Sequence, residues 1–310
     1  MKKNHLTIAT LLLLSLMLTH CDNKKKNIYQ YSFRENEQGI ELLENNSAVL
    51  FYQRAVKSLN GRYARNNYIH PLYSLDGDTL TEDFPSDHPH QRGIFWAWHQ
   101  ILADTTHIGD GWALKNFITD VVEVATSAKK DTALIHVLTL YKSPIFNNKK
   151  PYLDEHTLMK IYRPDDNSRI IDFTISLHSL VPRLFLGGSD DEKGYGGFSI
   201  RMRMPENLKF LTQKGYVKPQ IFQIDAGSWM DFSAPFGKDD KISGMTLFCD
   251  RQNPGYPQPW IIRQKSSMQN IVWPGRKAME IPKDKALILH YRLLIHNGNG
   301  KHLPIKEYRP

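Results

Sequence analysis

Cysteine is nearly absent from this sequence, and its two cysteines, Cys21 and Cys249, lie far apart. A domain held by a disulfide framework needs several cysteines, so that class of protein is excluded. Beyond the first 20 residues the sequence also lacks an apolar run long enough to cross a bilayer as a helix. Linkers rich in Gly, Ser or Pro and internal repeats are missing as well. The sequence therefore predicts one undivided domain.

A strong excess of charge of one sign is also missing. The chain has 40 Lys and Arg against 32 Asp and Glu, a net charge of +8, and no long basic stripe. A nucleic-acid-binding domain usually concentrates its positive charge on one face or along one helix. We therefore expect no nucleic-acid partner.

The first residues have the features of a secretory signal. Lys2 and Lys3 form a positive start, and the run from Ile8 to Leu18 is apolar apart from Thr10 and Ser15. This run has the length of a signal h-region and is too short to span a bilayer as a helix. An ordinary secretory peptide and an uncleaved anchor are the alternatives to a lipoprotein signal.

The residues after this run favour the lipoprotein signal. Leu18-Thr19-His20-Cys21 occupies the position of a lipoprotein cleavage box, with His20 in place of the usual small residue. We expect residues 1–20 to be removed and Cys21 to be lipidated. The protein would then be an exported, membrane-anchored lipoprotein of the periplasm or cell surface.

Lipidation has two consequences for the mature chain. Removing two lysines and no acidic residue lowers the net charge from +8 to +6, and Lys24, Lys25 and Lys26 carry half of that excess beside the anchor. These lysines can face anionic lipid headgroups. With Cys21 acylated, Cys249 has no partner, so no intramolecular disulfide forms.

The hydrophobic pattern has a period of two along most of the chain. Ile171, Phe173, Ile175 and Leu177 alternate with polar residues, which is typical of a strand with one buried face. Segments 132–141 and 286–295 are also β-rich. Turn signals separate the strands: Asp76-Gly77, Asn147-Asn148, Asp165-Asp166-Asn167, Gly187-Gly188 and Asn297-Gly298.

This pattern predicts an all-β fold, a large antiparallel β-sandwich with few or no helices. Residues 21–47 would hold the anchor followed by a tether or the first strands. Residues 48–310 would form a single sandwich domain.

The segment from Asp87 to His99 is the densest in chemically active residues. It contains three histidines, an aspartate, an arginine and two tryptophans. In an extended backbone, His88, His90 and Arg92 would project to one face and Asp87 to the other. The alternative is that these histidines bond backbone carbonyls at a buried turn.

Histidines two apart on a strand suit acid–base chemistry. We expect His88 or His90 to transfer protons, with Asp87 orienting or ionising the imidazole. Arg92 would hold a substrate charge or polarise a keto group. His88 and His90 would also be the ligands if a divalent metal were bound, although no third ligand is apparent. No other cofactor is expected.

Further candidates for substrate binding are spread along the chain. Trp96, Trp98 and Trp260 would stack on a sugar ring, or else belong to the core. Arg201 and Arg203 follow a glycine loop, residues 193–197, and residues 250–260 form a proline-rich loop. These segments suggest the rim of a pocket; the alternatives are a pair of solvated surface arginines and a structural loop without ligand contact. The remaining binding candidates are His70, His99, Arg201, Arg203, Asn253 and Arg263. We expect His88, His90 and Arg92 to line one cleft with at least one of His70, Arg201, Arg203 or Arg263.

Four motifs in order resemble the PmoA-like domain family, a domain of unknown function often labelled methane oxygenase. They are His70-Pro71-Leu72, Asp87 to Gly93, Tyr195-Gly196-Gly197-Phe198 and Asn253 to Trp260. Gln91 stands where the family usually has a second histidine. The resemblance covers residues 48 to the C-terminus and implies an all-β fold like the large sugar-binding supersandwiches.

The resemblance also implies a role with carbohydrates, because family members occur beside sugar oxidoreductases and isomerases. We expect a carbohydrate-active protein, either a glycosidase, a lyase or an isomerase that acts on glycosides or oxidised keto sugars. A sugar-binding lipoprotein without catalysis is the alternative. The identity of the sugar, the reaction and the oligomeric state stay open.

Overall fold

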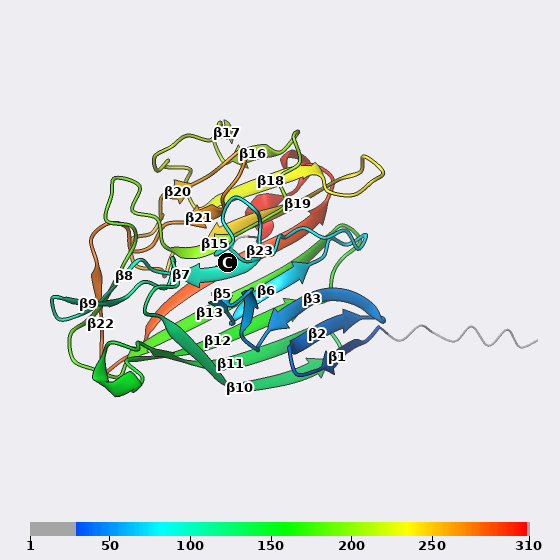
Figure 1. Ribbon diagram of the computed structural model, residues 1–310. Helices are drawn as coiled ribbons and strands as arrows, with labels where there is room; N and C mark the ends of the chain where they lie inside the picture. The colour runs from blue at the N-terminus through cyan, green and yellow to red at the C-terminus, as the bar shows by residue number, and fades with distance from the viewer. Residues whose placement is uncertain (1–28, 309–310) are drawn as a thin grey trace, which may run out of the picture.

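The computed structural model describes residues 29–308, and these residues fold into antiparallel sheets with only short 3-10 helices (Figure 1). The predicted signal peptide, Cys21 and the lysine run lie outside the described residues. Within residues 29–308, no helical segment has the length and apolar character needed to span a lipid bilayer.

The first large sheet has eight strands in the order β1-β2-β3-β6-β7-β15-β21-β20. Its strands are β1 Tyr31–Glu35, β2 Gly39–Glu44, β3 Ser47–Gln53, β6 Tyr68–Leu72, β7 Ile94–Ala97, β15 Gly197–Ile200, β20 Trp260–Ile261 and β21 Gln269–Ile271. β1 and β2 fall in the segment 21–47, so the sheet begins before residue 48, where the sequence placed the start of the domain.

The second large sheet has nine strands in the order β10-β11-β12-β13-β23-β19-β18-β16-β17. Its strands are β10 Ile118–Lys129, β11 Thr132–Lys142, β12 Leu153–Tyr162, β13 Ser168–Ser179, β16 Lys209–Thr212, β17 Gly215–Tyr216, β18 Trp229–Pro235, β19 Ile242–Cys249 and β23 Leu287–Asn297. Its pairing is antiparallel throughout, as the short turns between successive strands require.

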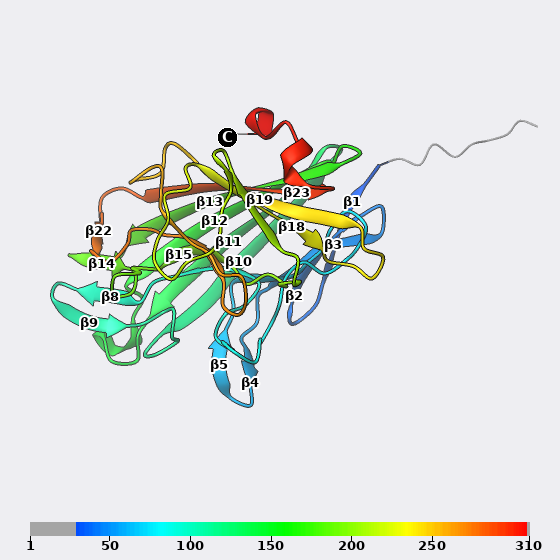
Figure 2. The same cartoon turned by 90° about the horizontal axis from the view of Figure 1, so that it is seen from above.

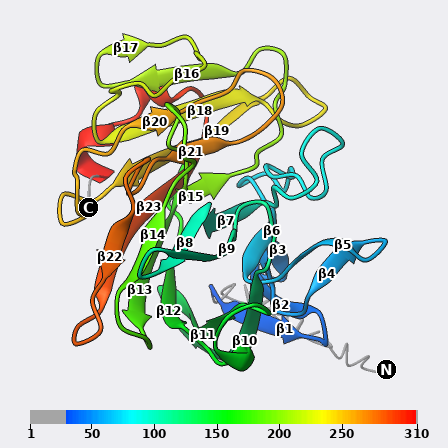
Figure 3. The ribbon, with the colours of Figure 1, turned by 60° about the vertical axis from the view of Figure 1, so that its left-hand side comes forward.

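Smaller elements lie at the edges (Figures 2 and 3). A four-stranded sheet has the order β22-β14-β8-β9, and β4 and β5 form a separate hairpin. The strands are β4 Lys57–Leu59, β5 Arg62–Arg65, β8 Gln100–Ala103, β9 Thr106–Gly109, β14 Leu184–Gly187 and β22 Met279–Ile281. The 3-10 helices are η1 Asn147–Lys149, η2 Gly300–His302 and η3 Ile305–Tyr308.

The two large sheets share one apolar core, which confirms the predicted sandwich. Leu50 and Ile94 from the first sheet and Phe173 and Leu293 from the second belong to the same buried cluster. Strand β13 shows why the sequence folds this way, because from Arg169 to Ser179 its residues alternate between buried and half-buried. Burying one face of each sheet against the other is the main favourable contribution to stability.

Candidate functional site

A cleft of about 390 Å³ gathers residues from several segments that lie far apart in sequence. Its size is in the range of small-molecule binding sites. It lies beside the ends of β7, β15 and β21, where loops replace the strands. The lining residues are His88, His90, Gln91, His99, Trp112, Ala113, Lys193, Tyr195, Arg263, Lys265, Ser266, Ser267 and Met268.

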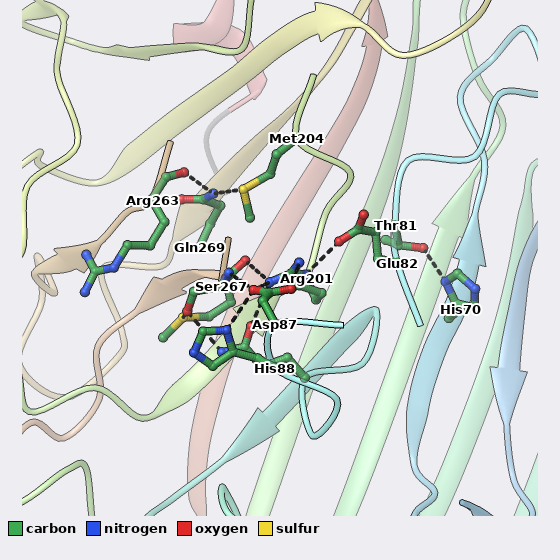
Figure 4. A network of polar contacts seen from close by, with 12 residues as sticks. His70, Thr81, Glu82, Asp87, His88, Arg201, Met204, Arg263, Ser267 and Gln269 are labelled. Atoms are coloured by element: carbon green, nitrogen blue, oxygen red, sulfur yellow. Dashed lines mark hydrogen bonds and ion pairs between the residues drawn. The ribbon is translucent and has the colours of Figure 1, made fainter. Parts of the chain in front are cut away.

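Asp87 anchors the histidine loop beneath this cleft (Figure 4). Its carboxylate accepts two hydrogen bonds from Arg201, at 2.7 and 2.9 Å, and one from the Ser267 backbone N–H at 2.7 Å. His88 Nδ1 lies 2.7 Å from the same carboxylate. Because an ionised carboxylate only accepts, this contact assigns the proton to Nδ1 and leaves His88 Nε2 available.

Arg201, directly after β15, connects this loop to the rest of the site. Its side chain is buried, and besides Asp87 it donates to Glu82 at 2.8 Å and to the Ser267 carbonyl at 2.7 Å. Burial alone would raise the pKa of Asp87. The hydrogen bonds from Arg201, His88 and Ser267 outweigh that effect and hold the pKa well below its ordinary value.

His90 lies next to His88, with their ring centroids 5.7 Å apart in an edge-to-face arrangement. Burial lowers the pKa of His90 to about 4, and the nearby Arg65, His88 and His99 act in the same direction. His90 is therefore neutral at neutral pH, so it can donate or accept a hydrogen bond without carrying charge.

A second histidine in the cleft is also held by a carboxylate. His99 Nδ1 lies 2.9 Å from Asp110 Oδ2, and Asp110 Oδ1 accepts from the backbone N–H groups of Trp112 and Ala113 at 2.9 and 2.7 Å. The contact with the carboxylate again places the proton on Nδ1. His99 Nε2 is buried and has no hydrogen-bond partner among residues 29–308.

Aromatic rings surround His99. Its ring stacks on Trp112 with centroids 5.5 Å apart, and Tyr195 meets both rings edge-on at 4.9 Å. Tyr195 lies in the glycine loop that leads into β15, and burial raises its pKa. This aromatic corner gives the polar cleft one rigid wall.

The cleft brings together four of the predicted site residues. His88, His90, His99 and Arg263 line it, and Asp87 and Arg201 lie directly behind the lining. The cleft therefore contains His88, His90 and Arg263, as predicted, but not Arg92.

Arg92 was expected to line the cleft, but the structure places it elsewhere. The backbone from Asp87 to Gln91 is a loop with a turn, Gln91 N–H donating to the His88 carbonyl at 2.9 Å, so alternation does not apply there. Arg92 is fully buried and pairs with Asp83 and Tyr68. It therefore cannot hold a substrate charge in this structure.

The three candidate stacking tryptophans belong to the core instead. Trp96, Trp98 and Trp260 are at most 5% exposed. Each indole N–H bonds inside the protein, to Glu155, the Trp273 carbonyl and the Gly227 carbonyl respectively. These tryptophans are therefore core residues and not platforms for a sugar ring.

The other candidates also lie outside the cleft lining. His70 contacts Thr81 Oγ1 at 3.0 Å, and burial lowers its pKa to about 4. Arg203 donates to the Phe236 carbonyl at 3.1 Å. Asn253 exchanges two hydrogen bonds with the backbone of His290, which fixes the proline-rich loop against β23.

The residues of this site do not fit a metal centre. Among residues 29–308, no group of three or more His, Cys, Asp and Glu side chains is arranged to hold a metal ion. Asp87, the carboxylate closest to His88, already has four hydrogen-bond contacts. The histidines are therefore better read as proton-transfer and hydrogen-bonding groups.

Several residues of the cleft lining carry no pattern that marks them in the sequence. Trp112, Lys193, Tyr195 and Lys265 were not among the candidates, nor was Asp110 behind the lining. Lys193 and Tyr195 lie in the glycine loop 193–197, and Asp110-Gly111 is an ordinary turn signal. In the sequence, only their position in or beside such loops could have indicated that they belong to the site.

Comparison with known proteins gives a family but no activity. The model of a family of unknown function, DUF6807, matches residues 39–308, and the chain belongs to that family. No curated protein matches the chain.

Proposed function

We propose that this member of a family of unknown function is an exported lipoprotein that transfers protons on a carbohydrate in the His88–His90 cleft. The observation that carries the proposal is the clamped pair of Asp87 and His88, with neutral His90 beside it. An imidazole oriented through Nδ1 by an ionised carboxylate is a good acid–base group at Nε2. Holding the pair by Arg201 preorganises it for chemistry.

The roles follow from these contacts. His88 takes and returns the proton, and Asp87 fixes its tautomer and orientation. His90 donates a hydrogen bond to a substrate oxygen while staying neutral. Arg201 is a positioning residue, because it lies behind the cleft lining and holds Asp87 and the Ser267 backbone in place.

The absence of carboxylates from the cleft lining favours a lyase or isomerase over a glycosidase. Hydrolysis of a glycoside usually requires two carboxyl groups on either side of the scissile bond. No Asp or Glu belongs to the lining of this cleft. The resemblance to the PmoA-like family, with its association with sugar-metabolising enzymes, supports a carbohydrate substrate.

The test is turnover of a panel of glycosides and 3-keto-glycosides by the purified full-length protein. On a substrate that the wild type converts, His88→Gln should lower kcat by about 10²–10⁴-fold. Asp87→Asn should also lower kcat, because the Asn amide favours the His88 tautomer with its proton on Nε2. Lys130→Gln, a change in the exposed β10–β11 turn, is the control. Full activity in both His88→Gln and His90→Gln would make the assignment wrong.

A sugar-binding lipoprotein without catalysis is the second candidate. The rigid aromatic corner of Trp112 and Tyr195 favours it, because a ring wall beside polar groups suits sugar binding as well as catalysis. Saturable binding of a glycan without product after long incubation would establish this function instead.

Lipidation is tested separately. Cys21→Ser should abolish incorporation of labelled fatty acid and release the protein from the membrane fraction. Equal labelling of both forms would contradict the anchor.

A further inference from the structure

The charge of the cleft is as distinctive as its histidines. Lys193, Arg263 and Lys265 line it, and the lining includes no carboxylate. Asp87 and Asp110, which lie behind the lining, are already engaged, Asp87 by Arg201 and Asp110 by backbone N–H groups. The cleft therefore presents a positive surface to its ligand.

Arg263 has the most specific geometry of these cations. Its Nη1 donates to the Gln220 and Ile262 carbonyls at 2.8 and 2.9 Å, and its Nη2 donates to the Ile221 carbonyl at 3.1 Å. These bonds fix the guanidinium. They leave Nε–H and the second N–H of Nη2 without a partner among residues 29–308.

Nε and Nη2 are the two nitrogens that grip a carboxylate through parallel hydrogen bonds. A guanidinium already held by backbone carbonyls loses little further freedom when it binds such a group. Of the described residues, none places a carboxylate within ion-pair distance of Arg263 or Lys265, whereas Lys193 has Asp191 at 3.9 Å.

The geometry points to a uronic acid, a sugar that carries a carboxylate at C5, as the substrate of this cleft. The Nε–Nη2 edge of Arg263 binds the carboxylate, and Lys193 and Lys265 add to the positive field. This inference rests on the proposed function, because it names the substrate class of the same site.

A uronic acid also gives His88 a proton to remove. Cations on the carboxylate stabilise the negative charge that develops when the C5 proton leaves. His88 Nε2 takes that proton, the C5–H electron pair forms a C4=C5 double bond, and the C4–O4 bond breaks with its electron pair on oxygen. The proton on His88 then passes to that oxygen. The products are an unsaturated uronate and a new hydroxyl end, and no water is consumed.

The rim beside Arg263 suits a chain of sugars rather than one ring. Ile221, whose carbonyl accepts a hydrogen bond from Arg263, is 65% exposed, and the next residue, Phe222, is 50% exposed. Exposed apolar and aromatic side chains offer a surface on which sugar rings stack. We therefore take a uronate-containing glycan as the substrate.

The first experiment measures binding by calorimetry with the full-length protein. The ligands are oligogalacturonates, their methyl esters and galactose oligomers of the same length. The free acid should bind about 10–100-fold more tightly than the ester or the neutral sugar, as expected for a charge-assisted bidentate contact. Arg263→Gln should remove this preference, Arg263→Lys should restore it in part, and Lys130→Gln should keep it. Thermal unfolding of each variant checks that the fold is intact.

The second experiment measures the ultraviolet absorbance of the C4=C5 product on polyuronates, with sulfated and plain neutral glycans as comparisons. The inference is supported if the wild type forms the unsaturated product from polyuronates only and His88→Gln does not form it. Equal Arg263-dependent binding of a sulfated neutral glycan would overturn the carboxylate assignment. His88-dependent turnover of neutral glycans would overturn the acidic substrate but leave the proposed function. Arg263-dependent binding of uronates without the unsaturated product would overturn the elimination and keep the substrate class. If no glycoside or 3-keto-glycoside is turned over either, the proposed function is overturned as well.

Discussion

The cleft contains two histidines held by aspartates, and the two pairs are built in different ways. Asp87 adjoins His88 in sequence but depends on Arg201, 114 residues away along the chain. Asp110 lies only 11 residues from His99 and is fixed by the backbone N–H groups of Trp112 and Ala113. One pair is therefore assembled by the tertiary fold, and the other by a local turn.

This difference indicates how each pair responds to change. The Asp87 pair has a buried cation as its support, so one substitution removes its ion pair with Arg201. The Asp110 pair rests on backbone groups that no single side-chain substitution removes. We therefore expect a single substitution to destabilise the Asp87–His88 pair more than the Asp110–His99 pair.

Arg201→Met should have the largest effect on stability. It removes the buried cation that pairs with both Asp87 and Glu82, and because these carboxylates are partly exposed the loss should be about 2 kcal/mol. Urea denaturation measures the free energy of unfolding. The control is Arg276→Met, which breaks an exposed pair with Asp190 and should cost less than about 1 kcal/mol. Equal losses in the two variants would mean that Arg201 does not support the site.

Acid should destabilise the protein through His90. Its pKa is 6.5 in the unfolded chain and about 4 in the folded one, so between these values the unfolded chain binds more protons. Stability is therefore lost as the pH falls from 6.5 to 4. Allowing for partial solvent exposure, the loss should be about 1–2 kcal/mol. His90→Gln should flatten the profile in this window, and an unchanged slope would show that His90 titrates normally.

Asp87 should act at lower pH. Its pKa is depressed in the folded state, so its contribution is complete above the unfolded value of 3.8 and is lost as the pH falls below it. Chemical denaturation between pH 5 and pH 3 of wild type and Asp87→Asn measures this contribution. The stability gap between the two should narrow toward acid by about 1 kcal/mol. A constant gap would indicate that Asp87 is not held ionised by Arg201.

The fold could be predicted largely from periodicity. Segment 132–141 lies within β11, and the alternation at Ile171–Leu177 lies within β13. The reason is that a strand buried on one face must place its apolar side chains two residues apart. The β1–β2 hairpin could not be predicted in this way, because residues 21–47 show no comparable alternation.

The site could be predicted only in outline. The histidine cluster located the cleft, but the turn at His88 breaks the two-residue alternation, so the sequence could not show that Arg92 points into the core. The tryptophans have both a polar and an apolar side, and only packing decides which is used. Lys193 and Arg263 reach the cleft because sheet topology brings β15 beside β7 and β21, which no local pattern records.

The smallest effect on stability, and the sharpest test of the contrast, is expected from Asp110→Asn. The amide oxygen can still accept from the Trp112 and Ala113 N–H groups, so the free energy of unfolding should fall by no more than about 1 kcal/mol. The amide N–H₂ now faces His99 Nδ1, which must accept, and the ring proton moves to Nε2. Nitrogen-15 chemical shifts of the imidazole report this exchange of tautomers. Asp87→Asn should produce the same exchange at His88 but with a measurable loss of stability, because Arg201 then loses its ionised partner. Retention of the Nδ1–H tautomer at His99 in Asp110→Asn would show that Asp110 does not set the state of that ring.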